Sequence, residues 1–436
     1  MPEAAGLGLE ELTGLHELLA AFAAIGTTSE GGVTRLAASA EDGQARDALC
    51  RWLRRQGFEI AIDRVGNLFG ILDLGVTAGN GAVYCGSHLD SQPNGGRFDG
   101  AYGVIAACCA ALAIRRRVDS GDLEPRHRYL VVVSWTNEEG ARYQPSLLGS
   151  SVFSGALEAT EALEACDAEG VQLAEALRKI GYLGQDAPPA EPDRYVELHV
   201  EQGAVLERQG RDIGVVTHCW GARKFRLRFL GRADHTGPTP MADRRDALRA
   251  ASLLVAEVSH RALASEGRLH GSVGRLLVEP NSPNVVPRSA TLFVELRAGA
   301  EDELNAAEAW LTESLDQICQ ATGCRSEIES STRRPVEAFD TYGVEIAKEA
   351  IDALGLDVTT MATIAGHDAL ALQRRTPATL LFVPSAGGVS HSPNEFTAEK
   401  DLENGLQALI AVIGRLLAVP PRQDHQGKGA QHESER

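Results

Sequence analysis

Histidine and carboxylate side chains gather at four places in this chain, each beside a short apolar run. Nitrogen and oxygen donors of these kinds bind divalent metal ions in proteins. A lone histidine is more often a core or surface residue than a ligand, and a lone carboxylate often begins a helix. Several of them at the ends of neighbouring strands would instead meet at one edge of a sheet and could hold metal ions for hydrolysis. The residues concerned are His88, Asp90, Asp99, Glu138, Glu139, His199 and His391.

The segment GSHLDSQPNGGRFDGAYG, residues 86–103, holds three of these residues. In an extended chain Leu89 points away from His88 and Asp90, so the two polar side chains share a face. We expect Asp90 to accept the second ring N–H of His88 and so to orient a metal ligand. The alternative is that His88 ends a strand and Asp99 begins a helix, and this segment alone does not decide between the two.

Two adjacent carboxylates, Glu138 and Glu139, follow a strand of almost purely apolar residues. Like charges repel at such a site unless a cation lies nearby, and a metal ion supplies one. Because neighbouring residues point in different directions, one carboxylate can bind metal while the other acts as general base toward water. Alternatively, both glutamates could favour the positive end of a helix dipole.

Apolar strands that alternate with helices must position these groups. Such alternation predicts a three-layer α/β/α catalytic domain, in which ligands bind beyond the carboxyl ends of the strands. The expected helices cover residues 8–25, 46–57 and 102–117, and the expected strands include residues 58–72, 81–90, 129–139, 194–203 and 380–388.

Residues 215–330 differ in character and follow the order β-α-β-β-α. This order predicts a smaller α+β domain of the ferredoxin-like kind, inserted into the larger one. The catalytic domain would then consist of residues 1–214 and 331–418. Residues 419–436 are polar and lack periodicity, so we expect a disordered tail.

The composition excludes several classes of protein. A formal charge of -18 argues against nucleic acid and anionic membranes as partners. No run reaches the roughly 20 apolar residues of a membrane span, and the N-terminus lacks a signal-peptide pattern. The eight cysteines form no CxxC pair, as is typical of reduced thiols. We therefore expect a cytoplasmic protein with two domains.

Seven segments, in order, resemble those of the hydantoinase/carbamoylase amidases: GSHLDSQPNGGRFDGAYGV, TNEEGARYQPSLLGS, ELHVEQG, ADHTGPTPMADRRDAL, NVVP, AGHDAL and GGVSHSPNEF. This family includes N-carbamoyl-L-amino-acid hydrolases, β-ureidopropionases and allantoate amidohydrolases, within the dinuclear aminoacylase and carboxypeptidase superfamily. The resemblance covers residues 8–415. It implies two divalent metal ions per subunit, and zinc, manganese, cobalt and nickel all remain open.

The resemblance also implies how the metal ions are held. His88 and His199 would bind one ion, Glu139 and His391 would bind the other, and Asp99 would bridge the two.

Three further residues would take part in catalysis. Glu138 would be the general base, and Asp90 would orient His88. His235, in ADHTGPTP of the inserted domain, would donate to the oxyanion of the tetrahedral intermediate from the partner subunit of a homodimer. The inserted domain would therefore serve as a lid and as the dimerisation domain.

The substrate carboxylate requires a cation, and Arg297 offers a planar guanidinium that binds carboxylates through two hydrogen bonds. Arg297 could instead pair with Glu295. Gln202 and Asn284 match substrate-contacting positions of the family. His367 could bind substrate or only support its loop.

The expected reaction is hydrolysis of the carbamoyl C–N bond of an N-carbamoyl-L-amino acid or a related ureido acid, which releases ammonia, carbon dioxide and the amino acid. A β-ureidopropionase and an allantoate or ureidoglycolate amidohydrolase are alternatives within the family. An aminoacylase, a dipeptidase and a binding protein without catalysis are alternatives outside it. Residues 218–220, His-Cys-Trp, depart from the family pattern at the start of the inserted domain and leave the exact substrate open.

Overall fold

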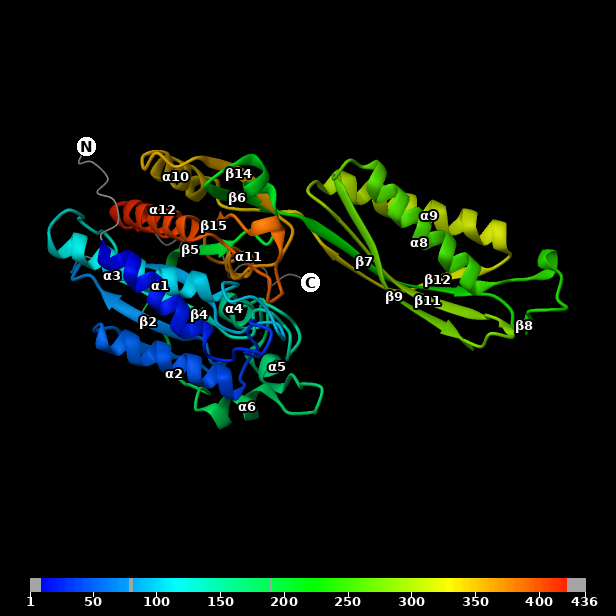
Figure 1. Cartoon of the computed structure of the whole chain (residues 1–436), viewed down its shortest axis with the longest axis horizontal. Coiled ribbons are helices and arrows are strands. Elements are labelled where there is room, and N and C mark those ends of the chain that lie inside the picture. The colour runs from blue at the N-terminus through cyan, green and yellow to red at the C-terminus, as the bar shows by residue number, and fades with distance from the viewer. Residues whose placement is uncertain (1–8, 78–80, 189, 422–436) are drawn as a thin grey trace, which may run out of the picture. The chain divides into compact units, whose positions relative to one another are not determined.

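The computed structural model describes residues 9–77, 81–188 and 190–421, and the chain divides into two compact units (Figure 1). The second unit consists of residues 218–338 and 362–365, and the first unit of the remainder. Each has its own buried hydrophobic core. From residue 422 on, the tail predicted to be disordered lies outside the described residues.

A large mixed sheet forms the centre of the first unit. Strands β3, β4, β5 and β15 are parallel and almost entirely buried, because helices cover both faces. The strand order is β1 (Glu59–Ile62), β2 (Leu68–Asp73), β4 (Tyr129–Trp135), β3 (Ala82–His88), β5 (Pro192–Val200), β15 (Ala378–Val383), β6 (Ile213–Cys219) and β13 (Glu337–Ala338), with β14 (Val358–Thr363) also paired to β6.

The helices of this unit complete the three-layer arrangement predicted from the sequence, which the structure confirms. Helices α3 and α12 pack against the strands β3, β5 and β15, whereas α2 and α4 pack against β1, β2 and β4. The helices are α1 (Leu9–Ala23), α2 (Ala40–Arg55), α3 (Ala101–Asp119), α4 (Leu148–Ser154), α5 (Ala159–Glu164), α6 (Leu173–Ile180), α7 (Val205–Gln209), α10 (Thr341–Asp352), α11 (Asp368–Leu372) and α12 (Glu399–Ala418).

The parallel strands bring the chemically interesting residues to one edge. His88 is the last residue of β3, and His199 lies one residue before the end of β5. β4 ends at Trp135, so Glu138 and Glu139 lie in the loop that follows rather than in the strand. His391 lies in the segment that follows β15.

The second unit is a four-stranded antiparallel sheet in the order β12-β7-β11-β9, with two helices on one face. Alternate residues of β7 and β11 point into its core, as expected for a sheet covered on one side only. The elements are β7 (Gly221–Leu230), β8 (Asp234–His235), α8 (Ala247–Ala264), β9 (Leu269–Glu279), β10 (Val285–Val286), β11 (Ser289–Ala298), α9 (Glu301–Thr322) and β12 (Arg325–Arg334).

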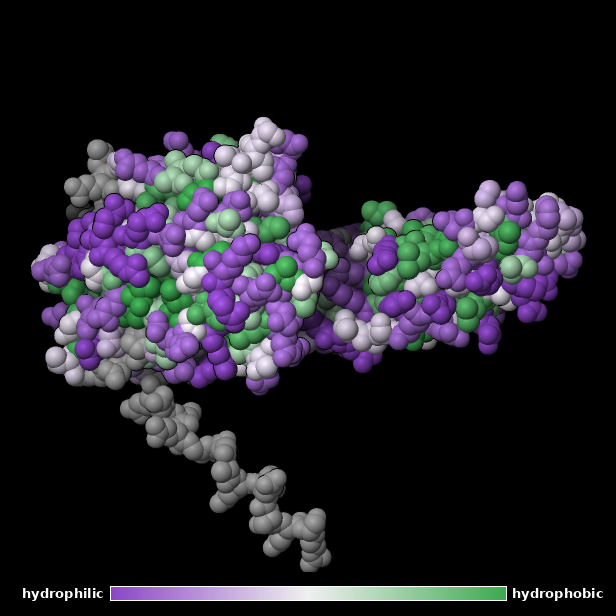
Figure 2. All heavy atoms as spheres, turned by 90° about the horizontal axis from the view of Figure 1, so that it is seen from below, coloured by the Kyte–Doolittle hydropathy of each residue, from purple (hydrophilic) through white to green (hydrophobic). Residues whose placement is uncertain are grey.

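Hydrophilic atoms predominate on the face shown in Figure 2, and apolar atoms form separate patches among them on both units. The exposed apolar side chains of the second unit include Leu263 of α8 and Ile328 of β12. Among the described residues, no helix combines the length and apolar character that crossing a bilayer requires.

Candidate metal centre

The loop between β3 and α3 places Asp99 against the histidine at the end of β3. Gly100 makes this close approach possible, because a Cβ at that position would lie 2.2 Å from the ring of His88. Gly100 also has φ +65°, a left-handed conformation that glycine adopts without steric cost. The only residue type without a Cβ therefore stands where the ring and the helix start must meet.

Asp99 is buried and lies between the side chains of three histidines. Its Oδ1 is 3.2 Å from Nε2 of His199 and 3.8 Å from Nε2 of His88. Its Oδ2 is 3.4 Å from Nε2 of His391, and the amide of Gln202 donates to the same oxygen at 2.9 Å. One carboxylate thus faces two sets of nitrogen ligands, as a bridging ligand would.

Glu139 completes the second set. Its Oε2 is 3.3 Å from Nε2 of His391, and the side-chain amide of Gln92 donates to that oxygen at 2.9 Å. The backbone N–H of Gln92 donates to the other oxygen at 3.3 Å. These bonds hold the carboxylate in place beside the loop that carries Asp99.

Glu138 and Asp90 lie beside the first set. Oε2 of Glu138 is 3.4 Å from Nε2 of His88. The carboxylate of Asp90 accepts the backbone N–H groups of Glu138 at 3.2 Å and Glu139 at 3.3 Å. Asp90 therefore fixes the backbone of the adjacent glutamates.

The orientation of His88 differs from the expected one. Its Nδ1 lies 2.9 Å from the backbone carbonyl of Asp90, while the carboxylate of Asp90 is 3.8 Å away. The carboxylate is already occupied by the two backbone N–H groups of residues 138 and 139, so the carbonyl takes the ring N–H. Similarly, Nδ1 of His199 faces the backbone carbonyl of Val200 at 2.9 Å. Both rings thus turn Nε2 toward Asp99.

Several carboxylates are buried close to one another at this site. Burial raises the pKa of Glu138 well above its ordinary value, and the nearby Asp368 and Glu139 carboxylates add to that effect. Burial, together with the charge of Asp99, raises the pKa of Glu139 to about 9. These carboxylates accept their negative charge readily only if a cation joins them.

The histidines respond to the same surroundings in opposite ways. Burial lowers the pKa of His88 to about 4, against the attraction of Asp99. Burial also disfavours the charged form of His199, but the hydrogen bond from its ring to Asp99 outweighs burial and raises its pKa to about 9. The Asp99 carboxylate therefore favours positive charge beside it, as a bridging metal ligand would.

The residues fit a pair of divalent ions. Two groups of potential ligands, each with ligand atoms within 4.8 Å of one another, share Asp99. Mixed imidazole and carboxylate donors suit zinc, manganese, cobalt and nickel alike. The two groups are His88, Asp99, His199 and Asp99, Glu139, His391.

A buried layer lies behind the first group. His367 is 1% exposed, and its ring meets that of His199 edge-on with centroids 4.6 Å apart. Glu197 accepts hydrogen bonds from the hydroxyl of Ser87 and from the backbone of Ala369, each at 2.7 Å. Burial lowers the pKa of His367 well below its ordinary value and keeps the ring neutral. This burial favours a supporting role for His367 over direct contact with substrate.

The remaining predicted residues belong to the second unit. His235 in β8 is opposite Val285 in β10, so His235 and Asn284 are neighbours. Arg297 of β11 is opposite Ala222, at the other end of the sheet.

Arg297 is already partnered. Its Nε and Nη2 contact Oε1 of Glu295 at 3.0 and 2.9 Å, and its Nη1 donates to the carbonyl of Ile364 at 2.9 Å. This is the pairing that the sequence left open as an alternative. Two of the five N–H donors of a guanidinium remain after these three contacts.

Four residues that support the site went unnoticed in the sequence. Gln92 and Ser390 contact ligands directly, because the hydroxyl of Ser390 donates to Asp99 at 3.1 Å. Glu395 accepts the backbone N–H groups of Phe98 and Asp99. Gln92, Ser390 and Glu395 lie within four residues of a predicted site residue, and Glu197 lies two before His199, so sequence proximity was the available signal.

Residues 84–415 match peptidase family M20/M25/M40. The allantoate amidohydrolase of Bacillus subtilis (strain 168) is 34% identical over 398 residues, which cover 91% of this chain and 95% of that protein. The N-carbamoyl-L-amino-acid amidohydrolase of Rhizobium meliloti is 34% identical over 400 residues, which cover 92% and 95%.

A solved structure has a similar fold. The crystal structure of an amidase of the hydantoinase/carbamoylase family from Burkholderia multivorans superposes with a TM-score of 0.85 at 34% identity. The match covers 94% of this chain and 98% of that one.

Proposed function

We propose that this chain, which belongs to peptidase family M20/M25/M40 and to its hydantoinase/carbamoylase amidases, hydrolyses the carbamoyl C–N bond of an N-carbamoyl-L-amino acid. The chain is a hydrolase of C–N bonds other than peptide bonds. The observation that carries the proposal is the pair of ligand groups that share Asp99, with Glu138 beside them.

The ligand groups would hold two divalent ions, one by His88 and His199 and one by Glu139 and His391, with Asp99 between them. When bound, such ions polarise a carbonyl and make water more acidic.

Glu138 would take the proton from the attacking water and return it to the leaving nitrogen. The hydrogen bond from its backbone N–H to Asp90 fixes the segment that carries it. Its raised pKa suits a carboxylate that must hold a proton for part of the cycle.

His235 would donate a hydrogen bond to the tetrahedral oxyanion, and Arg297 would bind the substrate carboxylate, with Gln202 and Asn284 as further contacts. His235 follows the Leu230 end of β7, whereas Arg297 is opposite Ala222. Eight residue steps of strand separate these ends, roughly 26 Å. An N-carbamoyl amino acid is far shorter, so one copy of the second unit cannot supply both groups to one substrate. We therefore propose a homodimer in which His235 and Asn284 come from the partner subunit.

A panel of substrates tests the proposal. The metal-loaded enzyme would be incubated with N-carbamoyl-L-amino acids, N-carbamoyl-β-alanine, allantoate, N-acetyl amino acids and dipeptides, and ammonia and free amine would be measured. Ammonia from N-carbamoyl-L-amino acids is the expected result. Preference for allantoate would favour the other activity named among the relatives, and amine release without ammonia would point to an aminoacylase or dipeptidase.

A further inference from the structure

A cavity of about 260 Å³ lies at one end of the sheet of the second unit, next to Arg297. It opens on the face of the sheet that α8 and α9 leave uncovered, because its strand residues alternate with those that point into the core. Its lining is unusually cationic for a chain with a formal charge of -18. The lining consists of Ala222, Lys224, Glu295, Arg297, Thr332, Arg333 and Arg334.

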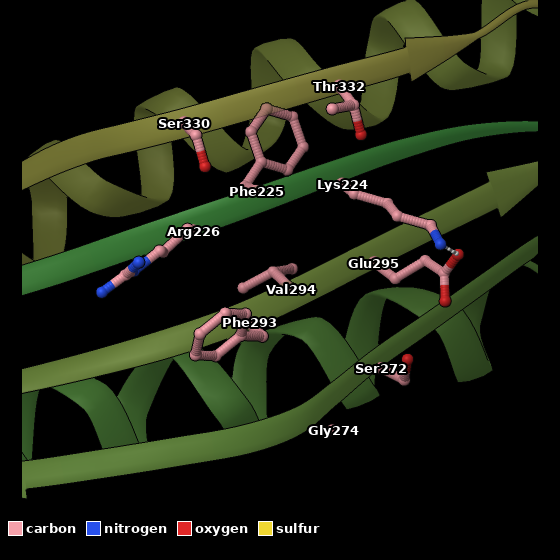
Figure 3. Close-up of a pocket in the computed structure, with 10 residues that line it drawn as sticks. All are labelled: Lys224, Phe225, Arg226, Ser272, Gly274, Phe293, Val294, Glu295, Ser330 and Thr332. Atoms are coloured by element: carbon pink, nitrogen blue, oxygen red, sulfur yellow. Dashed lines mark ion pairs between the residues drawn. The ribbon is translucent and has the colours of Figure 1, made fainter. Parts of the chain in front are cut away.

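One carboxylate, that of Glu295, forms ion pairs with two of these cations. Oε1 of Glu295 is 3.3 Å from Nζ of Lys224 and 2.9 Å from Nη2 of Arg297. Figure 3 shows Lys224 reaching from β7 toward Glu295 on the neighbouring strand β11. A single negative charge therefore faces two positive charges and leaves one of them uncompensated.

Arg334 adds a further cation. Its Nη2 donates to the carbonyl of Trp220 at 2.9 Å, and its Nε is buried without a hydrogen-bond partner. Within the described part of the chain, Arg334 forms no ion pair with a carboxylate. Arg333, by contrast, is paired with Glu308 of α9 and contributes no free charge.

A neighbouring hollow differs from this cavity in how its charged residues are paired. It measures about 460 Å³ and shares Lys224, Glu295 and Thr332 with the cavity (Figure 3). There Phe293 packs against the guanidinium of Arg226, which is ion-paired with Glu329 at 2.6 Å. The lining of this hollow therefore leaves less positive charge without a carboxylate partner than the lining of the cavity beside Arg297.

We propose that this cavity selects substrates with two carboxylates, such as N-carbamoyl-L-aspartate or N-carbamoyl-L-glutamate. The inference rests on the proposed function, in which Arg297 binds the carboxylate common to all substrates. Lys224 and Arg334 bind the second carboxylate, carried by the side chain of the substrate. A dianion neutralises both surplus charges of the cavity, whereas a monoanion leaves one of them without a carboxylate partner. The small volume suits a short acidic side chain better than an aromatic one.

The test compares substrates of the same shape that differ in charge. The kcat/KM of the metal-loaded enzyme would be measured for N-carbamoyl-L-aspartate against N-carbamoyl-L-asparagine, and for the glutamate and glutamine pair. Because a hydrogen bond between charged groups is stronger than one to a neutral amide, we expect a preference for the acid of at least about tenfold. Equal kcat/KM values for acid and amide would overturn the inference.

Substitutions test whether Lys224 and Arg334 cause the preference for the acidic substrate. Lys224→Gln and Arg334→Gln should each lower kcat/KM for the acid about tenfold and leave the amide within about twofold. Arg334→Lys keeps the charge and should keep most of the preference, which separates loss of charge from loss of packing. Arg268→Gln removes an exposed arginine that pairs with Glu303 elsewhere in the second unit and should change neither substrate.

The outcomes separate the two proposals. No ammonia from any carbamoyl substrate would reject the proposed function itself. Ammonia from asparagine and aspartate derivatives alike, or an equal loss for both in the variants, would reject only the choice of a dicarboxylate.

Discussion

At the scale of the residue, the proposed role of Glu138 as general base can be tested directly by substitution. Glu138 lies 3.4 Å from His88 yet belongs to neither ligand group. Glu138→Gln keeps the size of the side chain and removes its capacity to accept a proton. We expect kcat to fall by about 10²–10⁴, the usual contribution of a general base, with metal content unchanged. Ammonia release and elemental analysis of the same preparation measure both, and near-normal turnover would show that another group is the base.

Most of the ligand candidates could be predicted from the sequence because they lie at or just beyond the end of an apolar strand that the sequence itself reveals. His88, His199 and Glu139 need only their own strand to bring them to the shared edge of the sheet. The support of Glu139 by Gln92 joins segments 47 residues apart. Glu395 and the backbone of Phe98 are separated by 297 residues. Such partners are chosen by packing, which local pattern does not encode.

Even for residues two apart, such as His88 and Asp90, the sequence pattern did not predict which atoms form the hydrogen bond. Alternation correctly placed His88 and Asp90 near each other, but the carboxylate was needed by two backbone N–H groups of the following loop. Competition among donors in the folded state decided the pairing.

At the scale of the element, the start of α3 sets the position of Asp99 relative to His88. Gly100→Ala would introduce a Cβ 2.2 Å from the His88 ring, in addition to the cost of φ +65°. Because a clash of this kind adds about 1–3 kcal/mol to the cost of the backbone conformation, we expect lower stability and weaker metal binding. Urea unfolding and metal titration measure the two effects.

Gly121, just beyond the other end of α3, offers a matched control. It has φ +80°, and a Cβ there would meet no atom within 4 Å. Gly121→Ala should therefore lose only the roughly 1–2 kcal/mol that a left-handed alanine costs, with metal affinity unchanged. If both variants bound metal as the unaltered protein does, the clash with His88 would play no part in the site.

Two elements were difficult to predict from sequence, for opposite reasons. The sequence predicts one strand over residues 58–72, but Gly66 with φ +83° allows a turn and the run forms the hairpin β1–β2. β12 was not predicted, because its residues are polar and mostly exposed along an edge of the sheet. Its pairing with β7 depends on backbone hydrogen bonds rather than an apolar face.

At the scale of the whole molecule, the two units have separate hydrophobic cores, and both candidate ligand groups lie in the first. Chelation should therefore lower the melting temperature of the first unit and leave that of the second unchanged. At a metal concentration a hundredfold above Kd, the lost stabilisation is about 2.7 kcal/mol. Calorimetry before chelation, after it and after readdition of zinc or manganese measures the shift. If chelation left the melting temperature of the first unit unchanged, that result would argue against tight metal binding.

The proposed homodimer leads to the last prediction, because His235 and Arg297 lie toward opposite ends of the sheet of the second unit. Glu138→Gln and His235→Ala homodimers should both be nearly inactive, since loss of an oxyanion donor costs about 10²–10³ in kcat. Heterodimers of the two variants can be purified after coexpression with different tags. If His235 acts across the dimer, the subunit that retains Glu138 receives His235 from its partner, and the heterodimer regains about half of the normal activity. A Glu138→Gln dimer with two tags is the control. Activity no higher than that of this control would place His235 within its own subunit.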